Sequence, residues 1–249
     1  MSGTLGFGEQ WLGALNLRLI APDRPGLGSS TAQPGKTLGT WANDIGALLH
    51  ARQSHSFSVI GFSQGSAFAL ALGQCNGLKS LTLVAAQDQL SHPPTYQQLS
   101  PDIQQLVRQR QEDPAGFEQW LTEHASAQWL LEFVLSNSGP YDLQVYRDPA
   151  FLAAYRRCLD NGFSQGPAGY ARDLSLALGP WPVQPEAIQC PVHLWYGLRD
   201  SSSVHSPDAG ALLAQRFART QLTQFPEEGG ALLWTRSQMI LQAIASHLD

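Results

Sequence analysis

Charge, basic residues and long apolar runs are all scarce in this sequence. Charged residues make up 14% of the 249 residues and the formal net charge is -5, so we expect no nucleic-acid partner. No apolar run approaches the roughly 20 residues that a membrane span needs. The start, Met1-Ser2-Gly3-Thr4, lacks the basic and apolar regions of a signal peptide. We therefore expect a cytoplasmic protein without membrane contact.

Cysteine is also rare, and its spacing excludes two classes of small scaffold. Cys75, Cys158 and Cys190 are odd in number and widely separated, with no Cys-x-x-Cys pair. Neither a disulfide framework nor a structural zinc site is indicated. We expect three buried thiols, no metal site and no cofactor.

The rest of the sequence favours an α/β fold with one core. Hydrophobic residues make up 43% of the chain, and short β-rich runs alternate with helix-length segments, which is typical of a mostly parallel sheet with helices on both faces. Strands are predicted at residues 17–21, 56–60, 80–84, 192–196 and 221–225. Helices are predicted at residues 38–52, 64–73, 208–218 and 233–248.

Residues 87–186 break this alternation, because they read as several helices with no clear strand. We interpret them as a helical lid inserted between two parts of the core, residues 1–86 and 187–249. Aromatic residues recur in this stretch at helical intervals, among them Trp120, Trp129 and Phe133. We expect them to pack the lid onto the sheet; the alternative is that they form a wall of a substrate pocket.

The segment Gly61-Phe62-Ser63-Gln64-Gly65 carries the strongest chemical signal. A predicted strand runs into this Gly-x-Ser-x-Gly pattern and a predicted helix of small residues runs out of it, which is the setting of a nucleophile elbow. The two glycines remove side chains that would collide in so sharp a turn. We therefore predict that Ser63 is a nucleophile and that the Gln64 backbone N–H stabilises the oxyanion.

At this point the chain resembles the α/β-hydrolase superfamily, and within it the lid-bearing proline iminopeptidase-like group. The resemblance covers essentially the whole chain and is carried by four features in order: Ala21 to Ser30, the elbow, the lid, and Tyr196-Gly197-Leu198-Arg199-Asp200. It implies a hydrolase fold and an acid at Asp200, which would orient a histidine. Asp88, after the preceding predicted strand, is a second candidate for the acid.

The histidine departs from the pattern of that superfamily. Its members resemble one another in having Gly-His after the last strand, and Gly230 stands where this histidine is expected. Glycine cannot accept a proton, so another residue must supply the base or turnover is lost. His205, five residues after Asp200, and His92, at the root of the lid, are the two candidates near predicted strand ends.

The amino-terminal region departs as well. The resemblance implies three strands before the one predicted at 17–21, the third ending in a loop that donates an oxyanion-hole N–H. The sequence starts inside that loop, near Gly3-Thr4-Leu5. We expect a truncated start, with Thr4 standing at the position of this second oxyanion donor; in a complete chain the sheet would close differently and the donor would lie on a mobile terminus.

Two hypotheses from different classes follow. The first is a serine hydrolase acting on a small ester, lactone or amide, with Ser63, Asp200 and His205 as catalytic residues and Gln64 and Thr4 at the oxyanion. The second is a non-catalytic protein of the same fold that binds a small ligand or a protein partner, since a shared fold does not fix the chemistry. Gly230 is the argument for the second. A lyase of the same fold is a third class that no residue selects.

Overall fold

A parallel sheet forms the centre of the molecule. In the computed structural model, which describes residues 3–248, four strands lie in the order β1-β2-β3-β4 and every ladder between neighbours is parallel. The described residues do not include Met1, Ser2 and Asp249. The first two belong to the start of the chain, on which the expectation of no signal peptide depends. The strands are β1 (Phe57–Phe62), β2 (Leu78–Val84), β3 (Val192–Gly197) and β4 (Thr220–Phe225).

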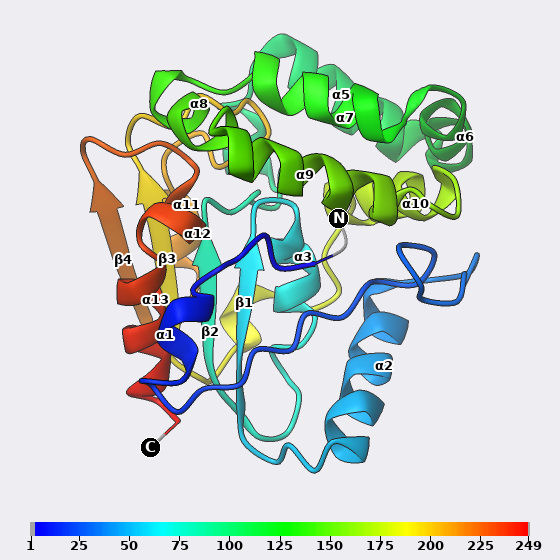
Figure 1. Cartoon of the computed structure of the whole chain (residues 1–249). Coiled ribbons are helices and arrows are strands. Elements are labelled where there is room, and N and C mark those ends of the chain that lie inside the picture. The colour runs from blue at the N-terminus through cyan, green and yellow to red at the C-terminus, as the bar shows by residue number, and fades with distance from the viewer. Residues whose placement is uncertain (1–2, 249) are drawn as a thin grey trace.

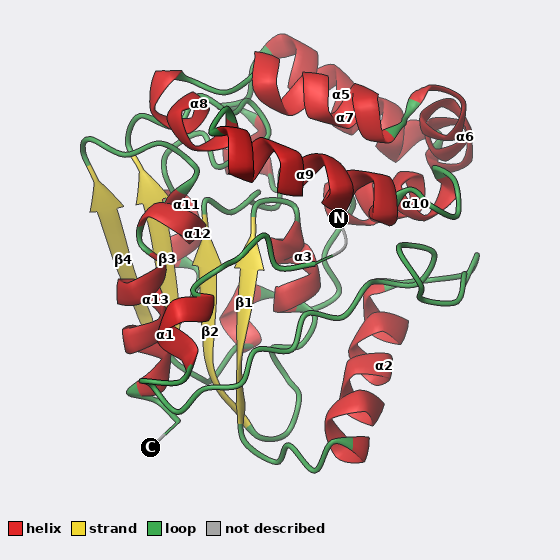
Figure 2. Ribbon diagram, in the orientation of Figure 1, coloured by secondary structure: helices red, strands yellow, loops and turns green. Residues whose placement is uncertain are grey.

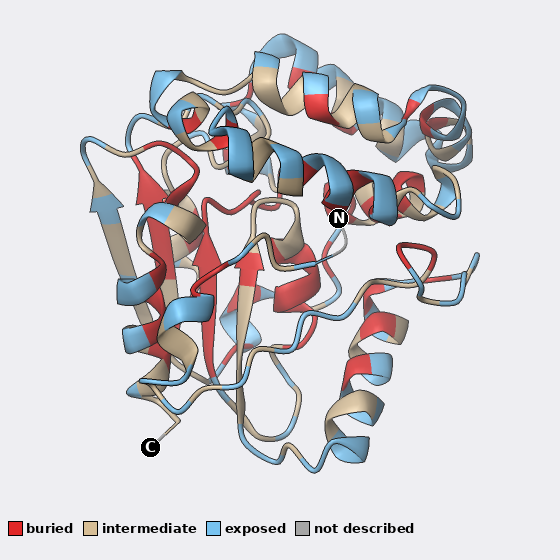
Figure 3. Cartoon of the chain, viewed as in Figure 1, coloured by how far each residue is buried: buried red, intermediate tan, exposed pale blue. Residues whose placement is uncertain are grey.

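Helices cover both faces of this sheet (Figure 2). Those belonging to the sheet layers are α1 (Glu9–Leu12), α2 (Leu38–Ala51), α3 (Gly65–Leu70), α11 (Ala211–Gln215), α12 (Leu232–Thr235) and α13 (Ser237–Ala245). Side chains of β2 alternate between the two faces. Leu81 and Leu83 pack in a cluster with Trp41 and Phe68, whereas Val84 packs in a second cluster with Ile240. Figure 3 shows β2 and β3 mostly buried, with the edge strand β4 more exposed and the covering helices exposed on their outer sides. The predicted α/β fold is confirmed.

A helical layer lies above the carboxyl ends of the strands (Figure 1). It spans residues 93–178, between β2 and β3 in sequence, and has a core of its own around Val107, Phe117 and Leu121. It consists of α4 (Pro93–Tyr96), α5 (Pro101–Glu112), α6 (Pro114–His124), α7 (Ala127–Ser136), α8 (Pro140–Tyr146), α9 (Pro149–Gly162) and α10 (Ala168–Leu178), and a short 3₁₀ helix (Pro185–Ala187) leads back to the sheet.

The strand predicted at residues 17–21 is wrong. This segment has no strand geometry, and β1 is paired with β2 alone among the described strands. Leu17 and Leu19 do pack beside the sheet, in the cluster of Val84 and Ile240. The apolar alternation of residues 17–21 therefore predicts their burial correctly. A strand also needs a neighbouring strand that satisfies its backbone hydrogen bonds. Residues 17–22 and β1 instead line the same cavity.

Three predicted helices are shorter than their apolar patterns suggest. The predicted helix at 208–218 begins only at Ala211, because Ala209 and Gly210 adopt left-handed φ values of 51° and 82°. The predicted helix at 233–248 is divided at Arg236 into α12 and α13. The predicted helix at 64–73 ends as α3 at Leu70.

Two further expectations need correction. None of the three cysteines forms a disulfide, but only Cys158 is buried; Cys75 and Cys190 are half-buried at the rim of the sheet core. Trp120 does not pack onto the sheet: it is 45% exposed and stacks on the His124 ring at 5.1 Å. Within residues 3–248 no helix is both long enough and apolar enough to cross a bilayer.

Candidate active site

The turn between β1 and α3 places Ser63 above the sheet in a strained conformation. Its φ of 51° is in the left-handed region, which non-glycine residues rarely adopt. Gly61 permits the turn, since a Cβ there would lie 2.7 Å from the Ala69 Cβ and 2.9 Å from the Ser66 Cα. The Ser63 carbonyl accepts the Gln87 N–H at 3.1 Å and the Ser66 hydroxyl at 2.7 Å. These bonds fix the backbone of the elbow.

Gly65 does not have the steric role that the motif predicts. A Cβ at Gly65 would meet no atom within 4 Å among the described residues. Gly65 instead lines a cavity together with Ser63 and Gln64. The space above this glycine is therefore part of the cavity rather than a close contact between strand and helix.

His205 stands between Ser63 and Asp200. Its Nε2 lies 2.7 Å from the Ser63 Oγ, and its Nδ1 lies 2.6 Å from the Asp200 Oδ2. With the ring proton on Nδ1, His205 donates to the carboxylate and accepts from the serine hydroxyl. The side chains of His205 and Asp200 are only 10% and 11% exposed. The three residues form a continuous hydrogen-bonded chain from serine to carboxylate.

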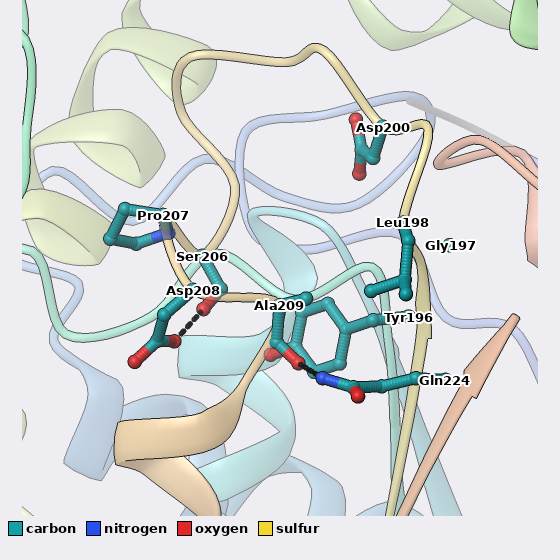
Figure 4. A pocket seen from close by; sticks show the side chains of 9 residues that line it. All are labelled: Tyr196, Gly197, Leu198, Asp200, Ser206, Pro207, Asp208, Ala209 and Gln224. Atoms are coloured by element: carbon teal, nitrogen blue, oxygen red, sulfur yellow. Dashed lines mark hydrogen bonds between the residues drawn. The ribbon is translucent and has the colours of Figure 1, made fainter. Parts of the chain in front are cut away.

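Asp200 is held by the loop that leaves β3 (Figure 4). Its second carboxylate oxygen, Oδ1, accepts the Ser202 N–H at 2.9 Å, and its own N–H donates to the Gly197 carbonyl at 3.2 Å. The loop after β4 reaches the same carboxylate from the other side: a Cβ on Gly230 would lie 2.7 Å from the Asp200 Oδ2. Gly230, which stands where the superfamily pattern has a histidine, is thus next to Asp200. The hydrogen bond to the Asp200 carboxylate comes from His205 instead.

Aromatic side chains surround the His205 ring on one side. Phe62, the residue before Ser63, packs edge-to-face against His205 with ring centroids 6.4 Å apart. Trp234 packs against Phe62 at 5.0 Å and against Phe151 of the helical layer at 5.0 Å. These rings confine the imidazole and keep that side of the site apolar.

A cavity of about 910 Å³ opens onto this chain of residues. Ser63, His205, Asp200, Gln64 and Thr4 all line it. Most of its other walls are apolar and come from the helical layer, from α2 and α3, from residues 17–22 and from the loop before α11. They include Trp41, Phe68, Trp120, Trp129, Leu130, Phe133, Tyr146, Leu174 and Val204. Trp120, Trp129 and Phe133 are therefore pocket walls, which was the alternative interpretation of these aromatic residues.

The two other acid–base candidates lie elsewhere. His92 begins α4 and has Arg216 and Glu186 as its charged neighbours; it does not line the cavity of Ser63. Asp88 is buried on the far side of the His205 segment, where it contacts the Tyr196 hydroxyl at 3.2 Å and the Ser206 hydroxyl at 2.8 Å. Among these candidates, the structure brings only Asp200 and His205 to Ser63.

Two residues of the site were missed from the sequence. Asp142 on α8 accepts the Ala231 N–H at 2.7 Å and also the Gly230 N–H, and burial raises its pKa. Gln87, just after β2, lines the cavity; it is 2% exposed and its amide nitrogen has no acceptor within the described part of the chain. A polar residue directly after a buried strand is a signal for Gln87, whereas no local pattern marks Asp142.

No group of three His, Cys, Asp or Glu side chains suited to a metal ion occurs among residues 3–248. The Ser63–His205–Asp200 chain can support acid–base and nucleophilic chemistry from protein groups alone. A serine whose hydroxyl faces an imidazole nitrogen, with a carboxylate on the other ring nitrogen, is the arrangement that activates serine toward carbonyl carbon.

Comparisons with known proteins agree with this architecture. A search among curated proteins finds no significant match. Among solved structures the chain is similar to a hydrolase from Pseudomonas aeruginosa PA01, with a TM-score of 0.69 and 19% identity over 97% of this chain and 85% of that one. It is similar to an enol-lactonase from Burkholderia xenovorans LB400, with a TM-score of 0.66 and 18% identity over 99% and 89%. It is also similar to an esterase from Thermogutta terrifontis, with a TM-score of 0.64 and 20% identity over 96% and 83%.

These structures share the fold at low sequence identity. The sequence itself also matches a family model described as "Alpha/beta hydrolase family", over residues 3–237. That match contains the elbow, the helical layer and the Asp200 loop. The chain therefore belongs to the alpha/beta hydrolase family.

Proposed function

We propose that the protein is a serine hydrolase that cleaves a small ester, lactone or amide through an acyl-enzyme on Ser63. The observation that carries the proposal is the pair of short contacts that His205 makes, at 2.7 Å to the Ser63 Oγ and 2.6 Å to the Asp200 Oδ2. A general base must lie within hydrogen-bond reach of the proton that it abstracts, and His205 does.

The reaction follows from these contacts. Ser63 Oγ attacks the substrate carbonyl carbon while His205 Nε2 takes the hydroxyl proton, and Asp200 stabilises the imidazolium that results. The oxyanion accepts the backbone N–H of Gln64, the residue after the nucleophile. Thr4, which lines the same cavity, stays the candidate for a second donor. His205 then protonates the leaving group, and a water molecule activated by the same imidazole hydrolyses the acyl-enzyme.

The cavity walls indicate the kind of substrate. Aromatic and aliphatic side chains dominate the lining, so we propose a substrate with an apolar group. Two amide nitrogens in the lining, those of Gln64 and Gln87, are buried without an acceptor among the described residues. A carbonyl or hydroxyl oxygen of the substrate would satisfy them. We further propose that the helical layer acts as a lid, as its position over the cavity suggests.

The non-catalytic hypothesis rested on Gly230, and the structure offers a physical reason to set it aside. The His205 Nδ1 already makes the hydrogen bond to Asp200 that a histidine at position 230 would make. With glycine at position 230, a histidine is therefore still present beside the carboxylate. The proposal therefore needs no histidine after the last strand.

Labelling with a fluorophosphonate probe tests the proposal. We expect one label per chain at Ser63, lost in Ser63→Ala, and turnover of p-nitrophenyl acetate that falls at least about a thousandfold in Ser63→Ala and His205→Ala. His92→Ala is the matched control and should keep its activity, because His92 does not line the cavity. Absence of labelling between pH 6 and 9, or full turnover in His205→Ala, would contradict the proposal.

A further inference from the structure

The segment that carries His205 has little regular structure to hold it. Residues 199–210, between β3 and α11, contain neither helix nor strand. His205 itself is tied to its own segment by an N–H bond to the Ser202 carbonyl at 3.2 Å. The next residue, Ser206, makes the connection to the sheet: its N–H donates to the Ala86 carbonyl at 3.0 Å. The position of the imidazole therefore depends on how firmly Ser206 is held.

The Ser206 hydroxyl is the centre of a polar cluster in which Asp88 is buried and Ser206 and Asp208 are half-buried. Its Oγ lies 2.8 Å from the Asp88 Oδ2 and 3.0 Å from the Asp208 Oδ1, and it accepts the Gly210 N–H at 2.8 Å. Figure 4 shows Ser206 and Asp208 at one end of the loop and Asp200 at the other, around a cavity of about 300 Å³. The centre of the cluster thus lies one residue after His205 in the chain.

Proton counting shows that one of the two carboxyl groups must be neutral for the cluster to be satisfied. A serine hydroxyl has one proton and can donate to only one of Asp88 and Asp208. The other contact becomes a hydrogen bond only if that carboxyl group is itself protonated and donates to the Ser206 Oγ. Asp208 already accepts the Leu212 N–H through its Oδ2 at 2.9 Å.

Asp88 is the member suited to hold the proton. It is 1% exposed, and burial raises its pKa to about 7. The charged groups around it act in both directions: Asp208 raises its pKa, whereas hydrogen bonds from Ser206 and Tyr196 and the charge of Arg216 lower it. The Tyr196 hydroxyl donates to the Asp88 Oδ1 at 3.2 Å, which leaves Oδ2 to carry the proton toward Ser206.

We propose that Asp88, in its neutral form, is a positioning residue of this hydrolase, which fixes His205 through its hydrogen bond to Ser206. The proposal rests on the proposed function, since it assigns to Asp88 an effect on the base of that reaction. Loss of the Asp88 proton leaves two carboxylates facing one hydroxyl, so one contact opens and the His205 segment loosens. Asp88 touches neither Ser63 nor His205 and acts only through its neighbour.

Steady-state kinetics of Asp88 variants between pH 5 and 9 test the proposal. Asp88→Asn keeps a donor for the Ser206 Oγ and an acceptor for the Tyr196 hydroxyl, so we expect kcat close to wild type at pH 6. We expect kcat of the wild type to decline above about pH 7, and kcat of Asp88→Asn to show no such decline. Asp88→Ala should lower kcat about tenfold to a hundredfold with KM within about twofold, because the imidazole is misplaced while the pocket is intact.

A double-variant cycle separates this role from general stabilisation. Ser206→Ala alone should lower kcat to the same degree as Asp88→Ala, and the double variant should lose no more than either single variant, because both break one path to His205. Asp44→Ala, at an exposed carboxylate on α2, is the control and should leave kcat unchanged. If Asp88→Ala does not fold, Asp88→Asn and Ser206→Ala still give the pH profile and the rate.

The outcomes distinguish the inference from the function on which it rests. Full turnover in Ser63→Ala or His205→Ala would overturn both. If those two variants are inactive while Ser206→Ala keeps wild-type kcat, or if Asp88→Asn retains the decline above about pH 7, the function stands and the role of Asp88 is refuted.

Discussion

At the scale of single residues, Asp200 is approached from two sides. The His205 Nδ1 lies 2.6 Å from the Asp200 Oδ2. Gly230 also lies close to this carboxylate, and a Cβ at position 230 would be 2.7–3.0 Å from its two oxygens and its carboxyl carbon. Glycine at position 230 is therefore a steric requirement of the arrangement in which the base comes from residue 205.

We expect Gly230→Ala to lower kcat by roughly tenfold to a hundredfold, because the new methyl group displaces the carboxylate from the His205 Nδ1. Gly230→His should lower kcat as well. Steady-state hydrolysis of p-nitrophenyl acetate measures both. Gly46→Ala is the control, since a Cβ there would meet no atom of the described chain within 4 Å. A rise in turnover in Gly230→His would show that the site lacks a working base and that His205 is not that base.

At the scale of elements, the helical layer and the core meet at Asp142. This α8 carboxylate is 3% exposed and accepts the Ala231 N–H at 2.7 Å. The same loop contains Gly230, which abuts Asp200. One buried side chain of the helical layer therefore holds the backbone next to the Asp200 carboxylate.

Replacement of Asp142 by alanine should leave two buried backbone N–H groups without an acceptor. We expect Asp142→Ala to lower the free energy of unfolding by about 1–3 kcal/mol. Asp142→Asn retains an acceptor oxygen and should lose less, and Asp102→Ala, at an exposed carboxylate on α5, should change little. Urea unfolding followed by tryptophan fluorescence measures all three. Equal stability of Asp142→Ala and wild type would show that the N–H groups find other acceptors.

The contrast between elements that were predicted and elements that were not has a physical basis. The strands β2 and β3 could be predicted because their apolar runs coincide with the core, and the elbow because its chemistry is contained in five residues. Residues 17–21 have the same apolar pattern but lack a partner strand, and no local pattern encodes the presence of a partner. Asp142 was missed because the Ala231 N–H that donates to it lies 89 residues away in sequence.

The residues of the candidate site also divide into those that a local motif marks and those that depend on distant parts of the chain. Ser63 and Asp200 stand at motif positions, so the sequence indicated them directly. His205 could be proposed only as one of two candidates, because spacing along the chain does not say which way a loop folds. Its contacts with both Ser63 and Asp200 arise from the path of residues 199–210, in which Ser206 donates its N–H to the Ala86 carbonyl and its hydroxyl contacts Asp88.

At the scale of the whole molecule, a buried ionic cluster ties the loop that precedes α2 to the helical layer. Asp173 on α10 is fully buried and contacts the Arg24 Nε and the Lys36 Nζ, each at 2.5 Å. Lys36 also donates to the Pro25 carbonyl at 2.7 Å, and burial lowers its pKa. Two cations thus share one anion in the interior.

We expect Asp173→Asn to reduce the free energy of unfolding by about 3–5 kcal/mol, because it leaves the buried Lys36 and the partly buried Arg24 without a counter-ion. The loss should be smaller at pH 10 than at pH 7, since Lys36, with its lowered pKa, can then lose its charge. Lys36→Met in the Asp173→Asn background should recover part of the stability. Denaturant unfolding at the two pH values measures the effect, and a loss independent of both pH and Lys36 would contradict this electrostatic explanation.

The closeness of Asp200 and His205 in sequence has a consequence for inheritance. The proposed base lies five residues after the proposed acid, so both are encoded in one short peptide between β3 and α11. A single recombination or loop graft would carry the pair together with its spacing. In the proposed mechanism the segment from β4 onward supplies no proton acceptor, and selection there acts on Gly230, on the cavity walls and on packing instead.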